Sequence, residues 1–129
     1  MLNQAGYQAY RKNKYETASP HRLIQMLYEA ALSNIAHAAK AIDDKQIMLA
    51  HRHIVRAQEI VSELIICLNE EQGGQVAANL KQIYLYVIDM LVKANLRKQK
   101  EPLAEAESLL LEIKSAWDQI GSEVSIGKI

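Results

Sequence analysis

The chain has 129 residues, a length that fits one domain able to bury roughly two-thirds of the surface that its unfolded form exposes. Lys plus Arg equals Asp plus Glu at 15 each, so no net charge would attract nucleic acid or an anionic membrane surface. No stretch reaches the roughly 18 apolar residues of a membrane span. The single cysteine, Cys67, excludes an internal disulfide. We therefore expect a cytoplasmic protein without direct membrane insertion.

The first expected helix spans residues 20–42. Ser19 followed by Pro20 predicts its start, because a serine oxygen can accept from the free backbone N–H groups of the first turn. Proline is tolerated at the first helical position, where its missing N–H has no intrahelical role. Apolar residues then recur at spacings of three and four. We expect residues 1–18 to form a mobile N-terminal arm ahead of this helix.

Three further helices are expected, over residues 45–71, 75–99 and 102–120. Gly73 and Gly74 predict the end of the second helix, because glycine readily adopts the left-handed conformation found at helix C-termini. Pro102 marks the next start, and residues 122–129 are expected to form a flexible tail. Four helices with short connections predict an all-α protein. Its architecture should be an antiparallel up-and-down four-helix bundle over residues 19–121.

The third expected helix is apolar on two opposite faces. At about 100° per residue, one face is expected to fill the core, and it contains Val76, Leu80, Ile83, Val87, Met90 and Ala94, with Tyr84 and Leu91 at its edge. The second face should present charge to water in a small domain, but it carries Leu85, Ile88, Val92 and Leu96. The second helix adds Val55 and Ile66 on its outer side. Two adjacent apolar stripes predict a groove that binds a partner.

No pattern in the sequence indicates a catalytic, metal or cofactor site. His51 and His53 lie about 200° apart on a helix and cannot chelate one ion. His37 and Lys40 have the spacing found in histidine-containing phosphotransfer domains, but Ala41 stands where those domains usually have glycine. A phosphotransfer bundle and a self-associating structural module, such as a weak homodimer, remain the alternatives to a binding protein.

Several short motifs, in order along nearly the whole chain, resemble the FliS family of flagellar secretion chaperones. They are Tyr7 and Tyr10, Thr17-Ala18-Ser19-Pro20, Leu23-Ile24-Gln25-Met26-Leu27-Tyr28-Glu29, Arg56-Ala57-Gln58, Gly73-Gly74, Ala78-Asn79-Leu80, Ala94-Asn95-Leu96 and Ala116-Trp117. The resemblance implies a cytoplasmic helical-bundle chaperone that is not an enzyme and needs no cofactor. It also implies binding of the disordered C-terminal segment of flagellin, protection from early polymerisation, and delivery to the flagellar type III secretion apparatus.

We predict that the flagellin segment covers the second apolar face. The flagellin-binding residues would be Leu85, Ile88, Val92 and Leu96, joined by Val55 and Ile66. A disordered segment that folds on binding needs a long apolar track more than a deep pocket. Tyr7 and Tyr10 are amphipathic, and we expect them to cap part of this surface when no client is bound.

Overall fold

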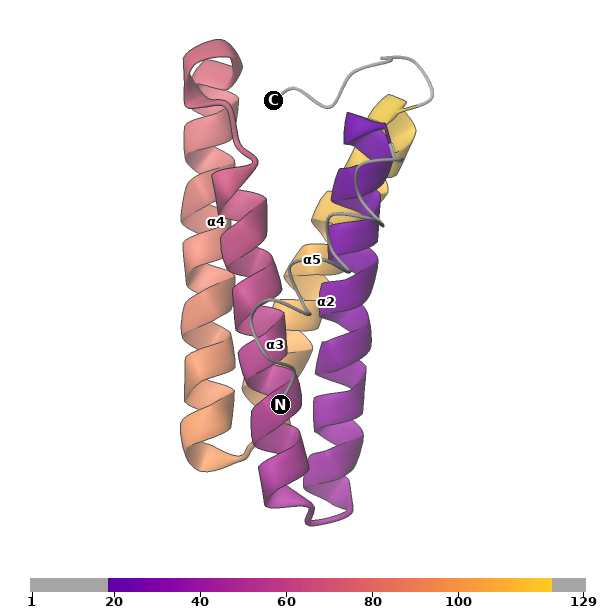
Figure 1. Ribbon diagram of the computed structural model, residues 1–129. Helices are drawn as coiled ribbons and strands as arrows, with labels where there is room; N and C mark the ends of the chain where they lie inside the picture. Colours follow the sequence, from indigo (N-terminus) through magenta and orange to yellow (C-terminus); the bar gives the residue numbers. More distant parts are fainter. Residues whose placement is uncertain (1–18, 122–129) are drawn as a thin grey trace, which may run out of the picture.

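A computed structural model describes residues 19–121 as four α-helices, and it confirms the all-α class. Their bounds are α2 Pro20–Asp43, α3 Ile47–Ile66, α4 Glu70–Arg97 and α5 Lys100–Gly121. Consecutive helices run in opposite directions, and both α2 and α4 pack against α3 and α5 (Figure 1). The described part of the chain is therefore an antiparallel up-and-down four-helix bundle. The predicted arm over residues 1–18 and tail over residues 122–129 lie outside the described residues.

Helix α2 begins where the sequence predicts. The Ser19 hydroxyl oxygen accepts from the backbone N–H of Arg22 at 3.1 Å, and Pro20 occupies the first turn. The cap satisfies one of the four N–H groups that the start of a helix leaves without an intrahelical partner. This start places the first turn of α2 beside the end of α5, where the Trp117 indole N–H donates to the backbone oxygen of His21.

The turn between α3 and α4 differs from the prediction. Helix α3 ends at Ile66 instead of continuing to residue 71, and α4 already begins at Glu70. The Asn69 side chain accepts from the backbone N–H of Gln72 at 3.1 Å, which caps a new helix before the glycines are reached. Gly74 then interrupts α4 with a φ of 54°, a conformation that glycine adopts without steric strain. The predicted bounds 45–71 and 75–99 are wrong at this turn because a side-chain cap precedes the glycines.

Two tyrosines meet inside the core. Tyr28 of α2 and Tyr84 of α4 are both buried, and their hydroxyl oxygens lie 2.5 Å apart across the diagonal of the bundle. Burial raises the pKa of Tyr84 to about 12, and it raises the pKa of Tyr28 further, with the nearby Tyr84 adding to the effect. Each hydroxyl provides the partner that the other needs, because a buried polar group without a hydrogen bond is destabilising.

Removing one hydroxyl of this pair should destabilise the bundle more than removing both. Tyr84→Phe leaves the buried Tyr28 hydroxyl without its partner, and we expect the free energy of unfolding to fall by roughly 1–3 kcal/mol. The double variant Tyr28→Phe/Tyr84→Phe should recover most of that loss, since no orphaned group remains. Urea denaturation of the two variants and the parent measures both values. A double variant that is less stable than Tyr84→Phe would contradict this pairing.

The inward face of α4 is narrower than predicted at its N-terminal end. Val76 was expected in the core, but its exposed fraction is 62%, and Leu80 and Ile83 are only partly buried. The buried residues of α4 are Ala77, Tyr84, Val87, Met90, Leu91 and Ala94. In Figure 1 the upper end of α4 extends past the end of α3 and lies apart from α2 and α5. Val76 does lie on the same face of α4 as the buried residues, as the helical periodicity predicts. Its side chain is nevertheless exposed, because it stands at the end of α4 that extends past the other helices.

Candidate binding surface on α3 and α4

A side-chain hydrogen bond sets the register between α3 and α4. The Asn95 amide donates to Nδ1 of His51 at 2.9 Å, and Lys98 donates to the Asn95 amide oxygen at 2.8 Å. Antiparallel helices rise equally per residue, so positions at equal sequence distances from this pair lie at similar heights. Gln58 and Ile88, each seven residues from the pair, therefore lie across from one another.

Most of the predicted binding residues lie on the outer side of this helix pair. We call the whole predicted set the α3–α4 strip, and its residues are Val55, Ile66, Leu85, Ile88, Val92 and Leu96. The exposed fractions are 44% for Leu85, 80% for Leu96 and 74% for Ile66, and Val92 is also exposed. Val55 is half-buried. Most of the strip is therefore apolar surface that is open to solvent in the described part of the chain.

Ile88 does not lie where the sequence prediction placed it. It was expected to point away from the core, but it is partly buried and packs against the core cluster. Ile88 is about 100° from the buried Val87 on the helix, at the edge of the inward face and not opposite it. Only part of its side chain is available to a partner, so Ile88 forms the edge of the strip on the side of α3.

The strip runs along both helices and ends at different heights. Val55 lies one turn from His51, on the edge of α3 that faces α4. Ile66, the last residue of α3, lies about 16 Å farther along that helix. Leu96 is next to Asn95 at the opposite end. The exposed apolar residues thus form a long track and not a compact pocket.

Two further exposed residues extend the strip and were missed by the sequence analysis. Ile47 and Met48 lie in the first turn of α3, and Met48 is 73% exposed. His51 is one turn away and bonds Asn95, so this turn lies near the end of α4 that carries Leu96. The signal in the sequence is the run Ile47-Met48-Leu49, since three consecutive residues at a helix start cannot all face the core.

Two of the four histidines form a small cluster between α2 and α3. The rings of His37 and His53 stack with centroids 5.0 Å apart, and Nδ1 of His53 donates to the Asn34 amide oxygen at 2.9 Å. Burial, followed by the charges of His37, Arg56 and Arg52, lowers the pKa of His53.

Among the described residues no group of three or more side chains is placed to hold a metal ion. No described helix is long and apolar enough to span a membrane.

Acidification should weaken the bundle partly through His53. Its native pKa is lower than the usual histidine value of 6.5, so between the native and unfolded pKa values the unfolded chain binds more protons than the native chain. The free energy of unfolding therefore falls as the pH drops through the interval between the unfolded and native pKa values. His53→Gln should reduce this pH dependence. Urea midpoints measured from about pH 7.5 to about pH 5 test it, and equal slopes for parent and variant would contradict it.

Known proteins show clear similarity to this chain. Residues 2–124 match the family model described as "Flagellar protein FliS". The flagellar secretion chaperone FliSB of Pseudomonas aeruginosa is 42% identical over 103 residues, which cover 80% of this chain and 82% of that protein. The flagellar secretion chaperones FliS of Salmonella typhimurium and Vibrio cholerae are 34% and 33% identical, over 97% and 90% of this chain and 96% and 88% of those proteins.

Proposed function

Because this chain belongs to the FliS family of flagellar proteins, we propose that it binds the C-terminal segment of flagellin and delivers it to the flagellar type III secretion apparatus. Its curated relatives are named flagellar secretion chaperones, and a chaperone of this family is not an enzyme. The finer statement, that flagellin is the client and its C-terminal segment the bound part, is our proposal. We place the protein in the cytoplasm, where a newly made client would meet it.

The observation that supports binding is the solvent-exposed α3–α4 strip. Covering one large apolar side chain contributes roughly 1.5–3 kcal/mol, so Leu85, Val92 and Leu96 together offer several kcal/mol before other costs are counted. Ordering a disordered client offsets a large part of that gain. A track with many modest contacts therefore gives useful affinity that the export machinery can still reverse. No bond is made or broken in this mechanism.

The client would bind as a segment with apolar side chains at helical spacing. Leu85, Val92 and Leu96 lie within about 17 Å along α4, which is about three helical turns of a docked segment. Occupying this track would hide the flagellin residues that otherwise assemble in the filament. The client would then remain unassembled until it reaches the export apparatus.

We also propose that Tyr7 and Tyr10 cap part of the strip in the free protein. Both residues lie outside the described part of the chain. If they act as a cap, Tyr7→Ala/Tyr10→Ala should increase client affinity, because the client no longer displaces them. A decrease in affinity would instead assign these tyrosines to client contact.

The direct test is calorimetric titration of the full chain with the C-terminal segment of flagellin from the same organism, with the N-terminal flagellin segment as the control. We expect saturable binding of the C-terminal segment only, with the negative heat-capacity change that apolar burial produces. Equal binding of both segments, or of neither, would reject flagellin C-terminal recognition.

The two alternative functions have distinct signatures. A phosphotransfer protein would form acid-labile phosphate on His37 when incubated with a phosphodonor. A self-associating module would show a sedimentation coefficient that rises with concentration, and Leu96→Asp would abolish that rise. A weak homodimer through the strip remains compatible with the chaperone if flagellin dissociates it.

A further inference from the structure

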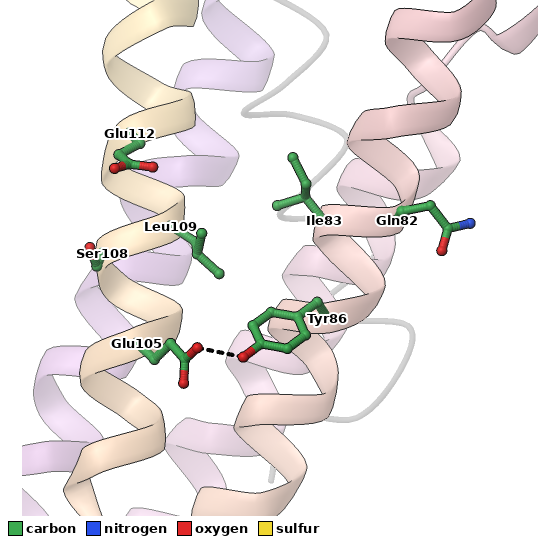
Figure 2. A pocket seen from close by; sticks show the side chains of 7 residues that line it. All are labelled: Gln82, Ile83, Tyr86, Glu105, Ser108, Leu109 and Glu112. Atoms are coloured by element: carbon green, nitrogen blue, oxygen red, sulfur yellow. Dashed lines mark hydrogen bonds between the residues drawn. The ribbon is translucent and has the colours of Figure 1, made fainter.

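A second open site lies on a neighbouring face of α4, between α4 and α5 (Figure 2). Its volume is about 360 Å³, and it is lined by Gln82, Ile83, Tyr86, Glu105, Ser108, Leu109 and Glu112. We call it the α4–α5 groove. Tyr86 lies on the edge of α4 that faces α5 and Asn95 on the edge that faces α3, and the exposed strip residues of α4 lie on the outward face between these two edges. The groove and the strip therefore occupy neighbouring faces of α4 and share no residue.

The floor of the groove is apolar and one end of it is closed. Figure 2 shows Ile83 of α4 and Leu109 of α5 pointing into the space between the helices. Both are partly buried and pack against the core. Below them the Tyr86 hydroxyl donates to the Glu105 carboxylate and bridges the two helices. An apolar side chain of moderate size can therefore enter between Ile83 and Leu109.

The charged residues of the groove are all acidic. Glu105 and Glu112 are seven residues apart on α5, so they lie on one face about 10 Å from each other. Within residues 19–121 neither carboxylate has an Arg or Lys nitrogen within 4.0 Å in an ion pair. Leu109 lies between them, four residues after Glu105 and three before Glu112. Helix α5 thus presents carboxylate, leucine and carboxylate in a line.

We propose that the α4–α5 groove binds a helical segment of a partner protein that carries basic side chains at positions i and i+7 with an apolar side chain between them. The spacing of seven residues matches the separation of Glu105 and Glu112, because both helices rise about 1.5 Å per residue. The intervening apolar side chain fills the space between Ile83 and Leu109. One basic group lies against the exposed ring of Tyr86 beside Glu105, where ring and carboxylate both attract a cation.

This inference does not depend on the identity of the client at the α3–α4 strip. The zero net charge of the whole chain would not attract a basic partner in general. Recognition at the groove depends instead on the positions of the Glu105 and Glu112 carboxylates relative to the apolar side chains between the helices. A partner with basic residues at another spacing would engage only one of them.

The probe for this site is a fluorescein-labelled alanine-based peptide with Lys at i and i+7 and Leu at i+3 and i+4. The matched peptide has the same composition with the two Lys at i and i+5. We expect the full chain to bind the first peptide about two- to fivefold more tightly in fluorescence anisotropy titrations, because the matched peptide loses one exposed ion pair. Equal affinity for the two peptides, or no binding of the first, would overturn the proposal.

Variants locate the peptide on the protein. Glu105→Gln/Glu112→Gln should weaken binding of the first peptide by about tenfold. The control Glu71→Gln/Glu107→Gln changes the net charge equally outside the groove and should leave the affinity unchanged. If both double variants lowered the affinity equally, the peptide would be responding to the overall charge of the protein, and the groove proposal would be rejected. If only the Val92→Asp/Leu96→Asp variant lost binding, the peptide would bind at the α3–α4 strip, and the groove proposal would be rejected.

Discussion

Replacing Val92 and Leu96 together by Asp is expected to weaken binding of the flagellin C-terminal segment by about 100-fold. Both side chains are exposed and belong to the α3–α4 strip, and Leu96 is 80% exposed. If the client covers the exposed part of both side chains, losing these apolar contacts removes roughly 2–3 kcal/mol, and about 1.4 kcal/mol corresponds to a tenfold change in the dissociation constant. Isothermal titration calorimetry with parent and variant measures the difference.

The control for this experiment is Leu111→Asp. Leu111 of α5 has an exposed fraction of 49%, similar to that of Leu85, and it is not part of the strip. The Leu111→Asp variant should bind the client with parental affinity, although it also introduces a carboxylate at an exposed leucine. Thermal unfolding should be close to parental for both variants because no core residue is changed. Equal weakening by Leu111→Asp, or full affinity in the double variant, would remove the strip from the mechanism.

Ile88 is unsuited to this test because it packs partly against the core. An Asp at this position would bury a charge beside apolar neighbours, which is destabilising unless the charge is paired. Lost binding could then reflect a damaged bundle. Leu85→Asp, at an exposed site one turn earlier, is the better third variant.

Trp117→Ala is expected to produce the largest loss of stability of any substitution considered. The indole is 3% exposed, stacks on the His21 ring at 5.0 Å and donates to the His21 backbone oxygen at 3.1 Å. It therefore joins the last turns of α5 to the first turn of α2. Truncating a buried tryptophan typically costs about 3–5 kcal/mol, through lost burial and the cavity left behind. For a domain of this size the melting temperature should fall by roughly 10–20 °C.

Trp117→Phe separates packing from hydrogen bonding at this position. The phenyl ring retains most of the apolar contact but cannot donate to His21, so we expect a loss smaller than that of Trp117→Ala by at least about 1 kcal/mol. Chemical denaturation followed by far-ultraviolet circular dichroism measures all three proteins. A melting temperature for Trp117→Ala within a few degrees of the parent would show that α2 and α5 do not depend on this contact.

Much of the fold follows from local sequence. Ser19 and Pro20 determine the start of α2 because the cap and the fixed proline φ act within one turn. Apolar spacings of three and four predict four helices, and their short connections favour an antiparallel bundle. The ordered motifs also indicated the family, which the family model and curated relatives then showed. These features depend on residues close together in the chain.

The direction that each helix face takes in the bundle was decided by tertiary contacts, whereas the α3–α4 turn was set by the local Asn69 cap. Periodicity sets the angles between residues on one helix, but it does not say which direction the core takes or where neighbouring helices stop. For this reason Val76 is exposed and Ile88 partly buried. The α4–α5 groove could not be predicted either, because it depends on how Ile83 and Leu109 from two helices are brought together. Sequence alone determined the helices, the bundle and the surplus of apolar residues on α4, whereas packing between helices determined which of those residues stay open to a partner.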